Sequence, residues 1–261
     1  MRRAAFSLIE VIVVVVIVSV LVAITLPVLG AVRRTSLGLK CLANLRSCTG
    51  AIDSYTIDFG DRFPYFADST SDPAFENGGY GMSFLWQSLH WPMVMDGRLG
   101  AVRFSDVRFC PADVILEEPA DVIADSYPAS YVYPGDYWLG EGFFTDPRLW
   151  RADADPLDPT LYHPVSVAQV TFPSQKGLLI ELFPYHRLDP GMQIADRGRA
   201  YSLRTNLDAS GRFHVSFVDG SVRSIDREAL ANGIDPGTNE PQPPVMTTRD
   251  GVHGLDLLVG H

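Results

Sequence analysis

One carboxylate stands apart from the other charged residues of the chain. Glu10 lies directly before Val11–Val32, a run of 22 residues without a charge. As a helix, this run spans roughly 33 Å at about 1.5 Å per residue, enough to cross a hydrocarbon core of about 30 Å. A carboxylate is costly in lipid, by about 2.5–3.5 kcal/mol for Asp at a helix centre and less near an end. Glu10 therefore needs either a partner or a position among the lipid headgroups.

The histidines do not form a recognisable catalytic or metal site. His163, His186 and His214 lack the HxxxH or HxxE spacing that places metal ligands on one face of a helix. The sequence also lacks a GxSxG nucleophile motif, a Walker loop and a dinucleotide fingerprint. We therefore expect no enzyme activity, no metal and ordinary surface or hydrogen-bonded histidines.

An acidic segment is the one candidate for calcium. Asp153 and Asp155 have the two-residue step that opens an EF-hand loop. Leu157 then stands where the third oxygen ligand belongs, and Asp158 stands where the glycine belongs. A solvated acidic loop is the simpler interpretation, so we expect no cofactor and keep Ca²⁺ as the alternative.

The three cysteines are too few for a disulfide scaffold, and they form no CxxC pair for structural zinc. In a continuous helix, Cys41 and Cys48 lie about 10.5 Å apart along the axis, beyond the roughly 7 Å limit between bridged Cα atoms. Cys110 is then the only intramolecular partner left for either of them. A chain with three reduced cysteines is the alternative.

Composition and charge limit the class of protein. A chain of 261 residues that is 46% hydrophobic can form one membrane segment and one ordinary globular domain. The formal charge of −10 and the absence of Lys and Arg clusters after Arg46 argue against a nucleic-acid surface. A cleaved secretory signal is a competing interpretation of the apolar run. The run is too long for such a signal, and Leu29 is not the small residue its cleavage site favours.

The helix is expected to continue beyond the membrane with one apolar face. Apolar residues recur there at spacings of three or four: Leu39, Leu42, Leu45, Cys48, Ile52, Tyr55 and Phe59. Pro27, Gly30 and Gly38 are positions where this helix could bend or melt locally. The apolar face needs a partner surface in the rest of the chain.

The remaining sequence predicts an α+β head in which a sheet covers this face. Residues 177–182 read as a buried strand, and Asp219-Gly220 reads as a two-residue hairpin turn between residues 215–218 and 221–225. In that register Phe217 faces Val222. The segment 113–164 is rich in Pro and Asp and predicts long loops. Its aromatic residues could form a binding face or cover a small core: Tyr131, Tyr133, Tyr137, Trp138 and Trp150.

The first eleven residues form a distinct pattern, in which Arg2 and Arg3 precede Ala5-Phe6 and Glu10 opens the apolar run. This pattern resembles the leader of type IV pilins and type II secretion pseudopilins. The resemblance implies that a prepilin peptidase cuts between Ala5 and Phe6 and that Phe6 becomes the methylated first residue. Glu10 is then the fifth mature residue and meets the Phe6 amine of a neighbouring subunit during assembly. Ala5 departs from the glycine usual before the cut.

Further segments are similar to the large pseudopilin-like proteins of planctomycete-type bacteria. They are residues 40–46 followed by Tyr55, Asp58 and residues 60–64, the Cys-Pro segment 108–113, and the hairpin 214–222, which resembles an H-X9-DG module. The module is incomplete, since Ala209 stands where the family has His. Because the Lys40-Cys41 and Cys110-Pro111 segments occur together in these proteins, the resemblance favours a Cys41–Cys110 disulfide.

The resemblance implies an organisation into a leader (1–5), a transmembrane helix (6–32), its amphipathic continuation (33–60) and a periplasmic α+β head (61–261). The long helix, half transmembrane and half amphipathic, would pack on an antiparallel sheet with long loops. The implied partners are prepilin peptidase, other pilin or pseudopilin subunits, an inner-membrane assembly platform and the lipid bilayer. The implied function is a structural subunit of a type IV pilus or a type II secretion pseudopilus.

Two other functions and one conflict remain open at this stage. A membrane-tethered periplasmic binding or adhesion module would not polymerise and would not need Glu10. A periplasmic hydrolase rests only on scattered Asp and His residues. Arg2 and Arg3 precede the apolar run, whereas four basic residues follow it, which by itself favours a cytoplasmic head: Arg33, Arg34, Lys40 and Arg46. We expect a single-pass inner-membrane protein with a cytoplasmic N-terminus, because long domains cross largely regardless of flanking charge.

Overall fold

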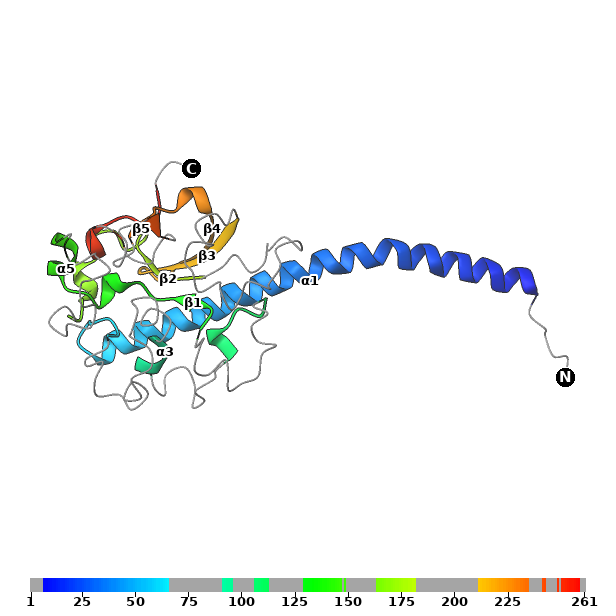
Figure 1. The fold of residues 1–261 in the computed structure, drawn as a ribbon. Helices are drawn as coiled ribbons and strands as arrows, with labels where there is room; N and C mark the ends of the chain where they lie inside the picture. Colours follow the sequence, from blue (N-terminus) through cyan, green and yellow to red (C-terminus); the bar gives the residue numbers. More distant parts are fainter. Residues whose placement is uncertain are drawn as a thin grey trace, which may run out of the picture.

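The structure is a computed structural model of the chain, and only part of the chain is described. The described residues are 7–65, 91–95, 106–112, 129–146, 148, 163–181, 211–234, 241–242, 248 and 250–258. The described part of the head packs along the C-terminal half of a long helix, and the N-terminal half of that helix extends away from it (Figure 1).

Helix α1 runs without interruption from Leu8 to Asp58 and contains 51 residues. It continues through Pro27, Gly30 and Gly38, so the local melting considered for these positions does not occur. The free part of the helix is gently curved (Figure 1). A single proline removes only one backbone hydrogen bond, which a helix of this length can accommodate.

The C-terminal end of α1 is fixed by two residues in the left-handed region. Gly60 and Asp61 have φ values of 67° and 59°. The Asp61 N–H then donates to the Thr56 carbonyl at 2.8 Å. This reversal satisfies a carbonyl of the last turn and turns the chain back toward the head.

The buried face of α1 begins at Cys41 and follows the helical repeat. Its members are Cys41, Asn44, Leu45, Cys48, Thr49, Ile52, Tyr55 and Thr56. The predicted apolar face is confirmed from Leu45 to Tyr55. It is wrong at both ends, where Leu39 and Phe59 are 63% and 50% exposed. Polar Asn44, which the apolar pattern omitted, can be buried because its side chain donates to a backbone carbonyl.

A four-stranded antiparallel sheet lies along this half of α1 (Figure 1). Its strands are β1 (Tyr131–Val132), β2 (Gly177–Glu181), β3 (Arg212–Phe217) and β4 (Val222–Asp226), in that spatial order. Helix α1 contacts β2, β3 and β4. The predicted α+β architecture, with a long N-terminal helix packed on an antiparallel sheet, is confirmed.

The β3–β4 hairpin is confirmed, but its predicted register is wrong by one residue. Ser216, not Phe217, faces Val222, and the Phe217 N–H donates to the Ser221 carbonyl at 2.9 Å. The loop therefore has three residues. Gly220 adopts φ 79°, the left-handed position that closes a three-residue hairpin loop with a bulge.

Short elements fill the rest of the described head. They are α3 (Trp91–Val94), η1 (Asp106–Arg108), η3 (Gly135–Tyr137), α5 (Glu141–Thr145), η6 (Val167–Gln169), η9 (Arg227–Ala229), β5 (Gly233–Ile234), β6 (Pro241–Gln242) and η10 (Gly251–His253). Strands β5 and β6 form a separate two-stranded sheet. The segment predicted to consist of long loops thus contains β1, η3 and α5 among its described residues.

The described aromatic residues before α5 are part of the core. They therefore do not form the binding face that was the alternative interpretation. Tyr131, Tyr133, Tyr137 and Trp138 are each at most 1% exposed. The three tyrosine hydroxyls donate to the carbonyls of Cys41, Pro64 and Gly177, respectively. Burial of the three tyrosine rings is possible because their polar ends are bonded. Trp150 lies outside the described residues.

Two isoleucines on α1 test this packing as a matched pair. Ile52 is fully buried and Ile57 is 76% exposed. We expect Ile52→Ala to lower the free energy of unfolding of the head by about 2–5 kcal/mol, because it leaves a cavity under the sheet. Ile57→Ala should change it by less than about 0.5 kcal/mol. Urea unfolding of the full chain in detergent, followed by tryptophan fluorescence, measures both. Equal effects would contradict the observed orientation of α1.

Candidate functional site

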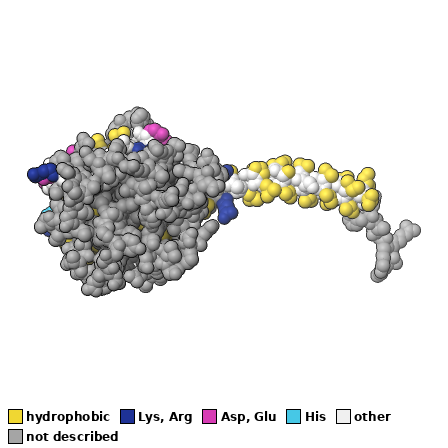
Figure 2. All heavy atoms as spheres, viewed as in Figure 1, with side chains coloured by type: hydrophobic (Ala, Val, Ile, Leu, Met, Phe, Trp, Pro, Cys, Tyr) yellow, Lys and Arg dark blue, Asp and Glu magenta, His cyan; other side chains and the backbone are white. Residues whose placement is uncertain are grey.

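The N-terminal half of α1 is an apolar surface that the rest of the described chain leaves uncovered. All residues from Ser7 to Ser36 are exposed, and the successive apolar residues of this half leave hydrophobic surface all around the helix. Figure 2 shows one face of this surface. Among the described residues, α1 alone is long and apolar enough to cross a membrane. Such a surface is stable only when lipid or other apolar helices cover it.

The polar side chains inside this half are satisfied by the helix itself. Ser19 Oγ donates to the Val15 carbonyl at 2.7 Å. Thr25 Oγ1 donates to the Val22 carbonyl at 3.1 Å. Lipid offers no hydrogen-bonding partners, so polar groups that face it must be bonded within the protein. These two residues therefore do not prevent the segment from residing in a membrane.

Glu10 lies at the start of α1 and closes its first turn. A Glu10 carboxylate oxygen accepts a hydrogen bond from the Ser7 backbone N–H at 2.8 Å. A helix N-terminus has free N–H groups and a partial positive charge, so a carboxylate there is stabilised. Glu10 is the only charged residue of residues 7–32. Ala5 and Phe6 lie outside the described residues, so cleavage and methylation at this end stay predictions.

A short exposed stretch separates the apolar half of α1 from the head. Arg33 and Arg34 follow the apolar segment, and Lys40 lies one residue before the buried face begins. Basic side chains gather at this junction (Figure 2). Residues 33–40 span about 12 Å of helix. The basic residues are therefore placed where lipid headgroups would lie if the apolar half were in a bilayer.

The head is fastened to α1 at its first buried turn. Cys41 and Cys110 form a disulfide with a Cα–Cα distance of 4.8 Å, which is the pair that the resemblance favoured. Asn44 Nδ2 donates to the Phe109 carbonyl at 2.9 Å, and Cys48 Sγ donates to the Val107 carbonyl at 3.3 Å. The bridge joins residues 69 apart, a closure worth about 4 kcal/mol on the chain-entropy model.

Cys48 is the remaining cysteine, and it is buried and reduced. Burial raises the pKa of its thiol to about 12, although nearby Arg108 acts in the opposite direction. The same burial lowers the pKa of the Arg108 guanidinium. Cys48 therefore behaves as a small apolar core residue and not as a reactive thiol.

A buried acid–histidine pair lies beside the disulfide. The Glu181 carboxylate contacts His214 Nδ1 at 3.1 Å and accepts the His214 backbone N–H at 2.9 Å. One Glu181 oxygen and the sulfurs of Cys41 and Cys110 lie within 4.8 Å of one another. The sulfurs are joined to each other, so they are not available as thiolate ligands for a metal ion. His214 is therefore a buried histidine that is hydrogen-bonded to Glu181. His163 is exposed, and His186 lies outside the described residues.

A buried charge cluster was not anticipated from the sequence. Lys176 Nζ lies 2.5 Å from Asp136 Oδ2, 2.6 Å from Thr248 Oγ1 and 3.2 Å from Asp256 Oδ2. Lys176 and Asp136 are fully buried, and Asp256 is 1% exposed. Lys176 directly precedes β2, and its partners come from η3 and the C-terminal segment, with sequence separations of 40 to 80 residues. No sequence motif has such separations, so the cluster could not be found by a search for motifs.

The pKa values of Asp136 and Lys176 are shifted by burial and by the neighbouring charges. Burial raises the pKa of Asp136 to about 6, against the opposing effect of Lys176 and with a contribution from Asp256. Burial alone would lower the pKa of Lys176, but the carboxylates of Asp136 and Asp256 raise it above its ordinary value. The lysine is thus held charged by its neighbours, and one carboxyl group of the cluster retains its proton into weakly acidic solution.

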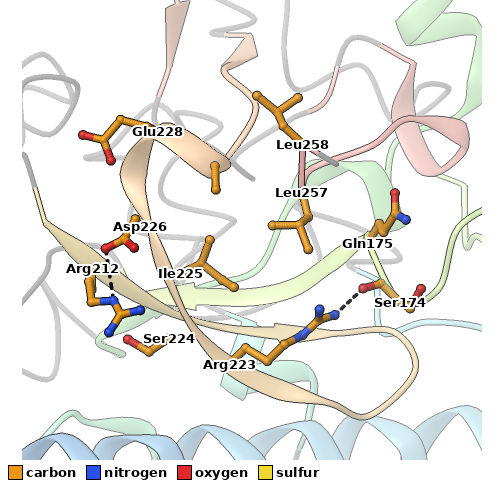
Figure 3. A pocket seen from close by; sticks show the side chains of 11 residues that line it. Ser174, Gln175, Arg212, Arg223, Ser224, Ile225, Asp226, Glu228, Leu257 and Leu258 are labelled. Atoms are coloured by element: carbon orange, nitrogen blue, oxygen red, sulfur yellow. Dashed lines mark hydrogen bonds and ion pairs between the residues drawn. The ribbon is translucent and has the colours of Figure 1, made fainter. Parts of the chain in front are cut away.

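A surface pocket lies between β4 and the C-terminal segment that carries Leu257 and Leu258 (Figure 3). Both of its arginines already have partners. Arg212 pairs with Asp226 at 3.0 Å, and Arg223 donates to the Ser174 carbonyl. Glu228 also lines the pocket and is exposed. The acidic segment considered for calcium, Asp153 to Asp158, lies outside the described residues, as does Ala209.

Comparison with known proteins gives one match. Residues 1–26 match the family model described as the prokaryotic N-terminal methylation motif. The N-terminal segment of the chain is therefore pilin-like. The motif implies processing by a prepilin peptidase and assembly with pilins, and it indicates a structural, non-enzymatic protein. Together with the apolar half of α1, it indicates a membrane-anchored pilin-like protein. No curated protein and no solved structure matches the chain.

Thiol labelling tests the cysteine arrangement. In the native oxidised protein at pH 8, iodoacetamide should label none of the three cysteines, because on the order of one in ten thousand Cys48 thiols is ionised at a pKa of about 12. Unfolding without reductant should expose Cys48 alone, and reduction should then expose Cys41 and Cys110. Peptide mapping identifies the labelled residues. Native labelling of Cys48, or a Cys48–Cys110 link, would contradict the structure.

Proposed function

We propose that this chain is a structural subunit of a type IV pilus or a type II secretion pseudopilus. The single observation that carries the proposal is the N-terminal half of α1. It combines a prepilin-type methylation motif, an uncovered apolar surface on all sides and one carboxylate at its first turn. A filament built from such helices would bury these surfaces against one another, as the bilayer does before assembly.

The proposed topology follows from this helix and its junction with the head. Residues 1–5 are the leader, residues 6–32 span the inner membrane, residues 33–60 continue the helix, and residues 61–261 form the head. The N-terminus is cytoplasmic and the head is periplasmic. The Cys41–Cys110 disulfide supports an oxidising compartment for the head, since such bonds are rare in the cytosol.

The role proposed for Glu10 is to select and align neighbouring subunits. Before assembly, its carboxylate accepts the N–H of Ser7 at the start of α1. Leader removal creates a cationic amine on Phe6, four residues away in the sequence. In lipid, an unpaired carboxylate and an unpaired amine are both costly, so the amine of one subunit would be drawn to Glu10 of the next. Assembly would also involve an inner-membrane platform.

The first test concerns the mature N-terminus. We expect the purified protein to begin at Phe6 with a methylated amine, because prepilin peptidases of this type cut and methylate at that position. Mass spectrometry of the N-terminal peptide measures both the cut and the methyl group. A mature chain that begins at Met1, or one that begins after Ala31, would contradict the proposal.

A matched pair of substitutions tests the role of Glu10. Glu10→Gln keeps an oxygen that can accept the Ser7 N–H but removes the charge, whereas Glu10→Asp keeps the charge on a shorter side chain. We expect Glu10→Gln to reduce filament yield at least about tenfold, because a neutral amide does not attract an amine strongly. Glu10→Asp should retain more of the filament yield than Glu10→Gln does. Membrane content and leader removal, measured in parallel, should be unchanged.

If Glu10→Gln assembles as well as the unmodified protein, Glu10 has no electrostatic role in assembly. A chain that is processed normally but forms no filament under any condition would instead support a membrane-tethered binding or adhesion module. The two outcomes are distinguished by electron microscopy of sheared cell-surface fractions alongside immunoblots of membranes.

A further inference from the structure

The buried cluster around Lys176 places a primary amine against a carboxyl group in a site without solvent. Lys176 Nζ lies 2.5 Å from Asp136 Oδ2, and both side chains are fully buried. A second carboxyl group, that of Asp256, lies 3.2 Å from the same nitrogen. The amine of Lys176 and the carboxyl group of Asp136 are thus held in contact, and the carboxyl group of Asp256 is close enough to transfer protons.

We propose that the Lys176 and Asp136 side chains become joined by an amide bond after the chain has folded, with Asp256 as the proton carrier. The bond would be an autocatalytic modification of the head. It does not depend on the assembly of filaments and would form in a single folded subunit.

The Asp136 carboxyl group is oriented for this reaction. Its Oδ1 accepts the backbone N–H of Thr248 at 3.0 Å, which can stabilise negative charge as a tetrahedral intermediate forms. Its Oδ2 lies against Lys176 Nζ and within 3.1 Å of Thr248 Oγ1. Oδ1 would therefore remain as the amide oxygen, and Oδ2 would leave.

Asp256 is positioned to receive and return a proton. Its Oδ2 accepts the Gly177 N–H at 2.9 Å, which fixes the carboxylate beside Lys176. Its Oδ1 accepts a hydrogen bond from Thr248 Oγ1. The Thr248 hydroxyl thus contacts both Asp256 and the departing oxygen of Asp136, and it can relay a proton between them.

The reaction balances without any further reactant. The starting state is Lys176 as the ammonium, Asp136 as the neutral acid and Asp256 as the carboxylate. Asp256 takes a proton from the ammonium, and the free amine attacks Asp136 Cγ to form the Nζ–Cγ bond. Asp256 returns its proton through Thr248 to Oδ2, the Cγ–Oδ2 bond breaks, and the oxygen leaves as water. Asp256 then takes the second proton from the nitrogen, which becomes the amide N–H. The products are an amide, a neutral Asp256 and one water molecule.

Burial favours this outcome over a persistent ion pair. Charges in a dry interior carry a large desolvation penalty, which their mutual attraction often fails to offset. The starting cluster contains a buried ammonium and at least one carboxylate, whereas the product contains no charge. Release of the water to solvent also favours the amide.

The titration of the surrounding groups is consistent with the required starting state. Asp136, with its pKa raised by burial to about 6, is the neutral acid below that pH, and an acid is a far better acceptor of an amine than a carboxylate. Burial also raises the pKa of Tyr133 and Tyr137 well above the ordinary value, so both phenols stay neutral. The remaining charged partners of Asp136 are Lys176 and Asp256.

Mass spectrometry of the full chain, purified in detergent, tests the proposal. After reduction and trypsin digestion, we expect the peptides that contain Asp136 and Lys176 to appear as one branched species, lighter by about 18 Da than their sum. Trypsin should fail to cleave after Lys176, because its ε-amine is acylated. Separate peptides of unmodified mass would overturn the proposal. So would the same mass loss on an unbranched Asp136 peptide, which would indicate a cyclic imide.

Two variants serve as controls. Asp256→Asn keeps an oxygen for the Gly177 N–H but cannot carry the proton, so the cross-linked fraction should fall by about 100-fold or more. Lys176→Arg keeps the charge and should show no branched peptide. Formation of the Cys41–Cys110 disulfide reports that each variant has folded. Undiminished cross-linking in Asp256→Asn would overturn the role of Asp256.

The pH dependence of the rate of cross-linking provides a readout that a purely structural ion pair would not give. Freshly synthesised protein held at about pH 5 should accumulate the branched peptide faster than protein held at about pH 8, because Asp136 is neutral only on the acidic side of its raised pKa. Equal rates at the two pH values would overturn the assignment of neutral Asp136 as the acceptor.

Discussion

The structure depends on one constraint. The two halves of a single unbroken helix must be covered by two different environments. Up to Ser36, α1 has only exposed residues, and from Cys41 onward one of its faces is fully packed. Apolar surface of this extent is not stable in water, so the first half requires lipid or neighbouring helices and the second half requires the sheet. The head is therefore built around the helix, with β2, β3 and β4 in contact with it. Helix α1 therefore serves both as the anchor of the protein and as part of the apolar interior of the head.

Much of this arrangement could be predicted from periodicity and local motifs. The apolar run, the face from Leu45 to Tyr55, the buried strand at residues 177–181 and the hairpin around Gly220 all depend on short-range patterns that the sequence displays directly. The hairpin register was wrong because an Asp-Gly pair fits both a two-residue turn and a longer loop that ends in a left-handed glycine. The ends of the apolar face were wrong because hydrophobicity alone does not show which surface the head covers.

The remaining features depend on contacts between distant segments. Lys176 meets Asp136, 40 residues earlier, and Asp256, 80 residues later, and neither spacing matches a known motif. A lysine directly before a buried strand was a signal that could have been weighed, since Lys is almost never buried without a partner. The Cys41–Cys110 pair was favoured by resemblance to other proteins, because spacing excluded only the Cys41–Cys48 alternative. The tyrosines before α5 became core for a reason that the sequence does not show, namely the carbonyl acceptors at the ends of their hydroxyl groups.

The position of the disulfide has a mechanical consequence. Tension applied along α1 from the membrane side would reach the head first at Cys41, the first fully buried residue of the helix. There, a covalent bond transfers the force to Cys110 and the segment around it, before the packed face from Leu45 to Tyr55 is sheared. Without that bond, the helix could be peeled from the sheet one turn at a time, each turn yielding under a small force. With it, withdrawal of the helix would require the whole packed face to yield together, or a covalent bond to break.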